Sequence, residues 1–189
     1  MCAHPLDMFT SIADRGGVVM GGKLTGDKRV SHGVALSVAR DVCATANDYC
    51  ETVNIAGSLR RLVPTEGLTI GDVDIVVIPK SDESLAEMML EFGVDPYTKR
   101  KQLRKGFSFV HDSVQVDVLV ADEDSFGAAM LFLTGSAKQN IQDRAVAKRK
   151  GWQLNQYGLW NALKQRVAIS EEDIHITLHG RVIPLNERG

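Results

Sequence analysis

The segment GDVDIVV at residues 71–77 places two carboxylates, Asp72 and Asp74, on one otherwise apolar strand. Side chains two positions apart on a strand project from the same face of the sheet. A third carboxylate, Asp117, lies between valines in a second apolar segment, VQVDVLV at 114–120. Strands this apolar are normally buried, and a buried carboxylate is costly unless a cation neutralises it. This pattern therefore predicts that the three carboxylates share a bound cation.

A divalent metal ion fits this pattern. Converging carboxylates repel one another and raise each other's pKa, and a divalent cation removes that conflict. Hard oxygen ligands suit Mg²⁺, and pairs of such ions about 4 Å apart serve phosphoryl transfer. The alternative is that Asp72 opens its strand from a turn while Asp117 faces solvent. The D-x-D pattern by itself does not decide between these interpretations.

The residues that precede the D-x-D strand favour the metal-dependent interpretation. The short strand predicted at 53–56 ends in Gly57 and Ser58, where backbone N–H groups and a hydroxyl can approach a phosphate closely. Arg60 and Arg61 follow at once, and a guanidinium group suits phosphate oxygens. This combination predicts a nucleotide-phosphate site beside the carboxylates.

Helical and strand patterns alternate along the 189 residues, enough for one compact domain or two small lobes. Helices are predicted at 31–49, 81–92, 126–133 and 140–150, from apolar periodicity and capping residues. Strands are predicted at 53–56, 72–78, 107–110, 114–120, 163–169 and 174–178. The mixture, with a hairpin at 107–120, predicts the α+β class.

Composition and charge exclude several classes of protein. No apolar run approaches the roughly 18 residues of a membrane helix, and the amino-terminal residues do not resemble a secretory signal. Three cysteines without metal-ligand spacing indicate a reducing compartment and no structural disulfide, so we expect a cytoplasmic protein with no membrane partner. The net charge is −2, but residues 97–150 hold ten basic and six acidic side chains, which suggests an anionic partner on one face.

Taken together, these motifs resemble the nucleotidyltransferase superfamily and, within it, the DNA polymerase beta-like X family. The matching segments are GSLRR at 57–61, GDVDIVV at 71–77, VDVLV at 116–120, residues 126–160 and the tail IPLNERG. The resemblance implies a nucleotidyltransferase palm at 31–122, with a mixed sheet and helices on one face, and a small α+β thumb at 123–189. It implies an amino-terminal extension at 1–30 and no lyase or fingers domain, the plan of minimal viral members.

The resemblance also implies roles for individual residues. Asp72 and Asp74 would each bind two Mg²⁺ ions, for which Mn²⁺ can substitute, and Asp117 would hold the ion that activates the primer 3′-hydroxyl. Phe132 and Gly135 would line the sugar of the nucleotide. The full set of implied nucleotide-binding residues is Gly57, Ser58, Arg61, Phe132, Gly135 and Asn140. The expected DNA-binding residues are Arg144, which would reach the template, and the basic side chains Lys99, Arg100, Lys101, Lys138 and Lys148.

The function implied is template-dependent DNA polymerisation, with short-gap filling in repair. The expected partners are gapped or primed DNA, dNTPs and a DNA ligase, and we expect a monomer. The alternative is a template-independent nucleotidyltransferase that modifies RNA, a small molecule or a protein. Asn140 and Arg144 favour the polymerase, because a template-free enzyme has no reason to keep them.

Some features depart from the family pattern or point elsewhere. Thirteen residues separate Ser58 from Asp72, more than is usual in the family, and Leu119 and Gln156 stand where relatives have an Arg and a Glu that pair on closure. His175 and His179 lie four apart on a predicted strand, without a third ligand, so we do not expect a metal site there.

Overall fold

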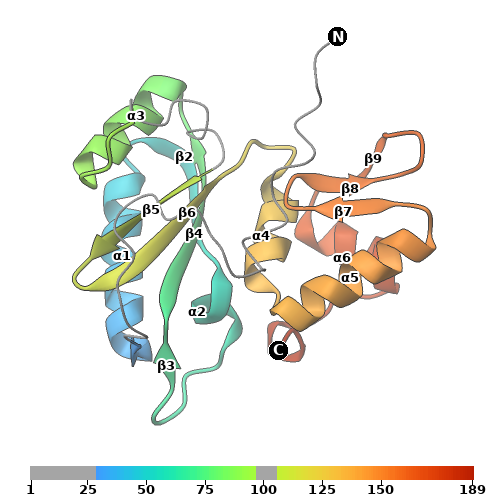
Figure 1. The fold of residues 1–189 in the computed structure, drawn as a ribbon, viewed down its shortest axis with the longest axis horizontal. Coiled ribbons are helices and arrows are strands. Elements are labelled where there is room, and N and C mark those ends of the chain that lie inside the picture. Colours follow the sequence, from blue (N-terminus) through green and yellow to red (C-terminus); the bar gives the residue numbers. More distant parts are fainter. Residues whose placement is uncertain (1–28, 97–105) are drawn as a thin grey trace.

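The computed structural model describes residues 29–96 and 106–189. Nearly all of the expected amino-terminal extension lies outside the described residues, as do Lys99, Arg100 and Lys101. The described residues form two neighbouring units, each of which contains helices and strands. Helix α4, Phe126–Thr134, joins them (Figure 1). The predicted α+β class is confirmed.

The first unit is built on a four-stranded sheet with the order β2-β4-β6-β5. The bounds are Cys50–Ile55 for β2, Asp72–Pro79 for β4, Gly106–His111 for β5 and Val114–Val120 for β6. Strands β4 and β6 run parallel, and the other neighbours are antiparallel, so the sheet is mixed. A two-stranded ribbon, β1 at Val30–Ser31 with β3 at Thr69–Ile70, lies beside this sheet.

The two long helices of this unit lie on one face of the sheet, as the resemblance implied. Helix α1 at His32–Ala46 and helix α3 at Asp82–Glu91 pack on one face, where Val73, Ile75 and Val77 of β4 point (Figure 1). The first turn of α3 is capped by Ser81, whose hydroxyl accepts from Ser84 N, as its position in the sequence predicts. Because strand side chains alternate, the carboxylates of β4 project from the opposite face.

The second face of the sheet carries α4 and a short helix, α2 at Gly57–Arg61. Val76 and Leu119 pack there against Ala129 and Met130 of α4. The sequence predicted only that Gly57 ends the strand, and α2 was not expected. Its five residues are too few for apolar periodicity to reveal a helix.

The second unit contains three short strands and two helices. Its elements are α5 at Ala137–Arg149, β7 at Gln153–Asn155, β8 at Gly158–Trp160, β9 at Arg166–Ala168, α6 at Glu171–His179 and a 3₁₀ turn at Leu185–Glu187. These elements enclose a separate core that includes Leu131, Leu159 and Ile174. Helix α4 contributes to this core as well as to the sheet of the first unit.

The strand predicted at 174–178 is wrong, because these residues belong to helix α6. Ser170 caps this helix, since its hydroxyl accepts from Asp173 N and donates to the Asp173 carboxylate. Gly180 ends it in the left-handed conformation, with φ 74°. His175 and His179 therefore lie one helical turn apart, His175 being buried and His179 at the last helical position.

Burial of His175 predicts a pH-dependent stability. Burial, with the nearby Arg188 charge acting in the same direction, lowers the pKa of His175 to about 4. In the unfolded chain, His175 binds a proton below about pH 6.5, whereas in the folded protein it binds one only near pH 4. The contribution of His175 to the free energy of unfolding is therefore fully present above pH 6.5. It is lost, by at most about 3 kcal/mol, as the pH decreases toward 4.

Urea unfolding of the wild type and of His175→Phe at several pH values between 4.5 and 7.5 measures this contribution. We expect the wild type to lose stability more steeply than the variant, since a phenyl ring has no proton to bind. Equal slopes for the two proteins would contradict the assignment.

Candidate active site

The three predicted carboxylates lie on adjacent parallel strands. Asp74 of β4 is paired with Asp117 of β6, and Asp72 is paired with Gln115. The register therefore places all three side chains on the face opposite α1 and α3. Gln115 Nε2 lies 3.1 Å from both carboxylate oxygens of Asp117 and donates to them. The two strands thus bring together the acidic residues that the sequence patterns singled out.

Their mutual repulsion is visible in the pKa directions. Burial, followed by the charges of Asp72 and Asp117, raises the pKa of Asp74 well above its ordinary value, although Arg61 opposes this. Burial and the charge of Asp117 also raise the pKa of Asp72, with Arg29 and a backbone hydrogen bond acting in opposition. A divalent cation would remove this conflict, so the donor set fits Mg²⁺ chemically.

The absence of a side chain at Gly57 leaves room for the Asp74 carboxylate. The glycine has φ 63°, and a Cβ built on it would lie 1.9 Å from Asp74 Oδ2 and 2.8 Å from Asp74 Cβ. The backbone is tied at the same point, since Ala56 N donates to Asp74 O at 2.8 Å. Both the positive φ and the close approach require glycine here. The turn between β2 and α2 therefore fits directly against the Asp74 carboxylate.

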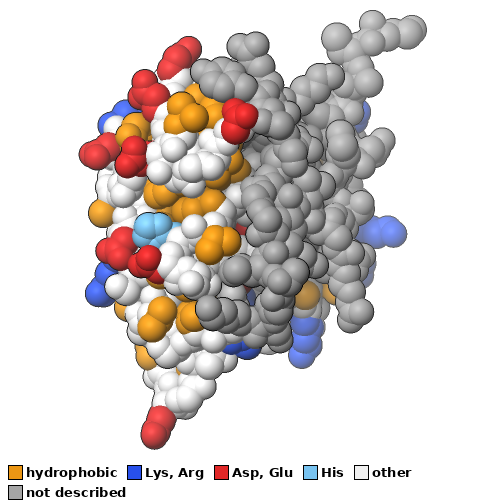
Figure 2. Space-filling view, turned by 60° about the vertical axis from the view of Figure 1, so that its left-hand side comes forward, with side chains coloured by type: hydrophobic (Ala, Val, Ile, Leu, Met, Phe, Trp, Pro, Cys, Tyr) orange, Lys and Arg blue, Asp and Glu red, His pale blue; other side chains and the backbone are white. Residues whose placement is uncertain are grey.

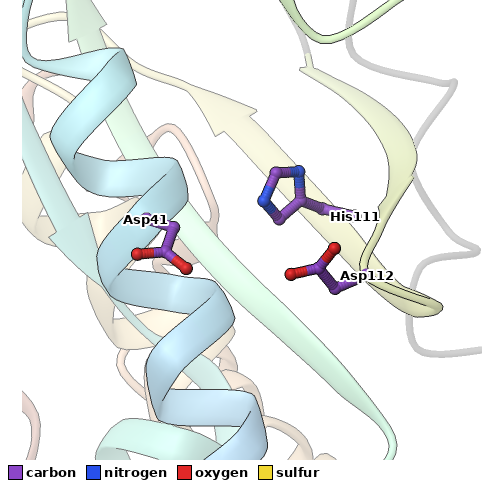
Figure 3. A group of neighbouring side chains, drawn as sticks. All are labelled: Asp41, His111 and Asp112. Carbon is purple, nitrogen blue, oxygen red and sulfur yellow. The ribbon is translucent and has the colours of Figure 1, made fainter.

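The carboxylate oxygens of Asp72, Asp74 and Asp117 do not all lie within 4.8 Å of one another. In the described part of the chain, the one group of three acidic, histidine or cysteine ligand atoms within 4.8 Å of one another comprises Asp41, His111 and Asp112 (Figure 3). Asp41 belongs to α1, and His111 and Asp112 lie at the β5–β6 turn. The two aspartates are exposed, on the helix-covered side of the sheet, so this group is separate from the Asp72–Asp74–Asp117 site.

The two arginines of α2 contact the second unit. Arg60 makes a bidentate pair with Glu171 of α6, at 2.9 and 2.8 Å, and donates to Thr134 Oγ1 at 2.8 Å. Arg61 donates through Nη1 to Thr134 O, while its buried Nε has no partner. Arg61 is also the cation whose charge acts on Asp74. Of the two, Arg61 is therefore the arginine beside the carboxylates, and Arg60 holds the two units together.

Glu171 was not predicted from the sequence, yet it joins three segments. Besides Arg60, it accepts from Arg188 near the carboxyl end. Burial raises the pKa of Glu171, but the hydrogen bonds and charges of Arg60 and Arg188 outweigh burial, so the pKa lies below its ordinary value. No sequence signal marked this residue, because its partners Arg60 and Arg188 lie 111 and 17 residues away in the chain.

The turn between α4 and α5 brings the remaining nucleotide-site residues together. Asn140 Nδ2 donates to Phe132 O at 2.7 Å and to Gly135 O at 3.2 Å. Asn140 is buried, and its amide nitrogen braces the turn that carries Phe132 and Gly135. Ser136 caps α5 by accepting from Gln139 N at 3.1 Å.

The predicted DNA-contacting residues that are described lie on α5. Arg144 is partly exposed, and its Nε donates to Asn140 O at 3.2 Å, so these two residues share one side of the helix. Lys138 and Lys148 are exposed at its two ends. The opposite end of the molecule differs in charge, because acidic side chains gather over the face that carries α1 and α3 (Figure 2).

Comparison with known proteins agrees with this arrangement. A family model described as DNA polymerase beta thumb matches residues 129–189. The chain is 26% identical over 140 residues to the DNA polymerase/3'-5' exonuclease PolX of Bacillus subtilis, a match that covers 70% of this chain. It is 29% identical over 110 residues to the repair DNA polymerase X of African swine fever virus, a match that covers 55% of this chain.

The chain is therefore similar in sequence to X-family DNA polymerases. The resemblance predicted from the motifs is thereby confirmed. The matches span 23% of the bacterial relative and 61% of the viral one, so this chain corresponds to part of each. In the described ranges, no helix is both long and apolar enough to cross a lipid bilayer.

Two positions at which the chain departs from the X-family pattern lie in the interior. Leu119 packs in the small core between the sheet and α4. Gln156 is 4% exposed, and its Nε2 has no hydrogen-bond partner. Both positions carry uncharged side chains, so neither of them places an unpaired charge in the interior.

Proposed function

We propose that this protein is a template-dependent DNA polymerase that adds a dNTP to a primer 3′-hydroxyl and fills short gaps during repair. The observation that carries the proposal is that Asp72, Asp74 and Asp117 lie on one face of adjacent strands, with the Gly57 turn and Arg61 beside Asp74. The relation to repair polymerases of the X family supports the same conclusion.

In the reaction, the primer 3′-oxygen forms a bond to the α-phosphorus, and the bond from that phosphorus to the pyrophosphate breaks. The three carboxylates would hold two Mg²⁺ ions, which supply an activated 3′-oxygen and stabilise the charge that develops on the phosphates. Gln115 orients Asp117 through its side-chain amide. Arg61 and the backbone of Gly57 and Ser58 would bind the triphosphate, where charged donors are strongest.

The charge distribution supports one orientation of the DNA. Helix α5 carries basic side chains at both ends, whereas the α1–α3 face carries acidic ones (Figure 2). Phosphates would be repelled by the acidic face and attracted to α5. We propose that primed DNA lies along α5, in front of the carboxylates, and that the protein works as a monomer before a DNA ligase seals the nick.

Primer extension on a one-nucleotide gap, with each dNTP opposite each template base, tests this function. We expect Mg²⁺-dependent addition of one nucleotide, selected by the template base. Addition at equal rates regardless of the template base would instead favour a template-independent nucleotidyltransferase.

Replacement of Arg144 separates the two functions. A guanidinium at this position on α5 can sense minor-groove acceptors, which lie in similar places in every correct base pair. Loss of one charged hydrogen bond costs about 1.5–3 kcal/mol, so Arg144→Ala should lower kcat/KM for templated insertion roughly ten- to a hundredfold. Arg144→Lys should not restore the rate, because an ammonium group lacks the planar fork.

The matched control is Gln142→Ala, an exposed substitution on the same helix, which should leave kcat/KM unchanged. Single-turnover insertion by the four proteins gives the comparison. Unimpaired gap filling by Arg144→Ala would argue against this placement of the DNA.

A further inference from the structure

The three carboxylates of the candidate active site share the face of the sheet with one uncharged side chain, Gln115. Across the parallel strands β4 and β6, Asp74 pairs with Asp117, and Asp72 pairs with Gln115. Gln115 and Asp117 lie two positions apart on β6, so their side chains project from the same face. Four side chains therefore lie side by side there, three of them acids and the fourth a neutral amide.

The amide of Gln115 bonds to the carboxylate of Asp117. Gln115 Nε2 lies 3.1 Å from both Oδ1 and Oδ2 of Asp117. Because the contact is equally long to both oxygens, it restricts rotation of the carboxylate about its Cβ–Cγ bond. Each carboxylate oxygen can accept more than one partner, so this contact leaves the oxygens with capacity to bind a cation as well.

The two carboxylates of β4 are balanced differently. Burial and neighbouring negative charges raise the pKa of Asp72 and that of Asp74. At Asp72, the charge of Arg29 opposes this rise in pKa. At Asp74, the charge of Arg61 opposes it. The hydrogen-bond donor to Asp117, in contrast, is uncharged, so it orients this carboxylate without setting a full positive charge against it.

The neighbours of Gln115 on β5 explain why its amide turns toward Asp117. Strand β5 pairs Val110 with Gln115 and Ser108 with Asp117. Val110 offers the amide no polar side-chain atom, and Gln115 is only partly exposed to solvent. A half-buried amide stabilises the fold when it is hydrogen-bonded, and the carboxylate two positions along the strand provides the acceptor.

We propose that the bond from Gln115 to Asp117 persists when a divalent cation binds, so that this neutral amide is a positioning residue that sets both the orientation of Asp117 and the affinity of the site for the metal. This inference rests on the proposed function and deepens its metal site. Groups that bond to a metal ligand from outside orient it, and their loss typically costs ten- to a hundredfold in metal affinity or activity.

Two substitutions of similar size separate orientation from charge. Gln115→Met keeps the length of the side chain but has no donor, whereas Gln115→Glu exchanges the donor for a fourth carboxylate. Mn²⁺ is the probe, titrated into the protein without DNA and followed by its EPR signal. Gln115→Met should raise the Kd for Mn²⁺ roughly tenfold. Gln115→Glu should bind Mn²⁺ at least as tightly as the wild type, because affinity rises with the number of charged ligands.

Insertion rates should follow a different order. In saturating Mg²⁺, Gln115→Glu should insert a nucleotide roughly tenfold more slowly than the wild type, because Asp117 loses its donor and faces a new like charge. Gln115→Met should need more Mg²⁺ than the wild type to reach its maximal rate. Tight metal binding together with slow insertion in Gln115→Glu is a result that a role in stability alone would not produce.

The matched control is Gln153→Met, which replaces an exposed glutamine on strand β7 of the second unit. It should change neither the Kd for Mn²⁺ nor the insertion rate. Thermal unfolding shows whether each variant is folded. A folded Gln115→Met with wild-type Kd and rate, or a folded Gln115→Glu with the wild-type rate, would overturn the proposal.

A measurement on the wild type needs neither activity nor a folded variant. In ¹⁵N-labelled protein without DNA, Mg²⁺ should shift the side-chain amide signals of Gln115 while the amide protons stay protected from exchange with water. If the signals do not respond to Mg²⁺, or if they move to the position of an exposed amide such as that of Gln153, the proposal is refuted. If they respond as expected but no templated insertion occurs, the proposed function fails while this role of Gln115 stands.

Discussion

Asp117→Ala and Asp74→Ala are each expected to abolish nucleotide addition, leaving less than a few per cent of the wild-type rate in saturating Mg²⁺. Asp74 and Asp117 are paired across the parallel strands β4 and β6, so either change removes a ligand from the centre of the proposed metal site. Their DNA affinity should be retained or increased, because a negative charge that faces phosphate is lost. Single-turnover insertion and equilibrium DNA binding measure the two effects separately.

The matched control for this test is Asp112→Ala, which removes an exposed carboxylate on the other face of the sheet. Asp112→Ala should insert nucleotides at the wild-type rate. This result would show that the other two variants lose activity because a metal ligand is missing, and not because the first unit has one negative charge fewer. Substantial activity in Asp117→Ala would refute a mechanism that depends on all three carboxylates.

Gly57→Ala is expected to have the second-largest effect, a loss of insertion rate of roughly a hundredfold or more. The added methyl group would lie 1.9 Å from Asp74 Oδ2 and 2.8 Å from Asp74 Cβ, so rotation of the carboxylate alone cannot relieve the contact. Either the Gly57 turn or β4 must move, and both carry groups of the proposed site. The positive φ adds a backbone cost of about 1 kcal/mol to stability.

Gly67→Ala is the control that separates the clash with Asp74 from the backbone strain of a residue with positive φ. Gly67 lies in the loop that follows α2 and has φ 75°, but a Cβ there would meet no atom within 4 Å. It should lower the stability by a similar amount and leave insertion intact. Equal losses of activity in the two variants would mean that backbone strain, and not the approach to Asp74, explains the effect of Gly57→Ala.

The carboxylate site could be predicted because strand periodicity is strict. Alternation fixes which side chains share a face, so the spacing of Asp72 and Asp74 was enough to specify a common direction. The parallel pairing of β4 with β6, which brings Asp117 to the level of Asp74, was not predicted, because the spacing within one strand does not specify its neighbour. Which of Arg60 and Arg61 approaches the carboxylates depended on contacts with the thumb, and the sequence left that open.

Helix α6 was missed because its apolar residues, Ile174, Ile176 and Leu178, happen to alternate. The signals at its ends were present, namely the Ser170–Asp173 cap and Gly180, and they outweigh a short alternation. Glu171 could not be found in this way, since its role depends on Arg60, 111 residues earlier in the chain. Long-range ion pairs leave no local pattern in a sequence.

The Arg60–Glu171–Arg188 contact has a consequence for how the protein folds. Sequence separation sets the entropy that must be lost before two groups can meet, and pairings this distant form late. During synthesis, the Gly57 turn would leave the ribosome long before the residues that fix Arg60 exist. The α2 end of the first unit is therefore completed only once α6 and the carboxyl-terminal residues have docked. A fragment that ends before α6 would carry the three carboxylates without the ion pair that holds Arg60 in place.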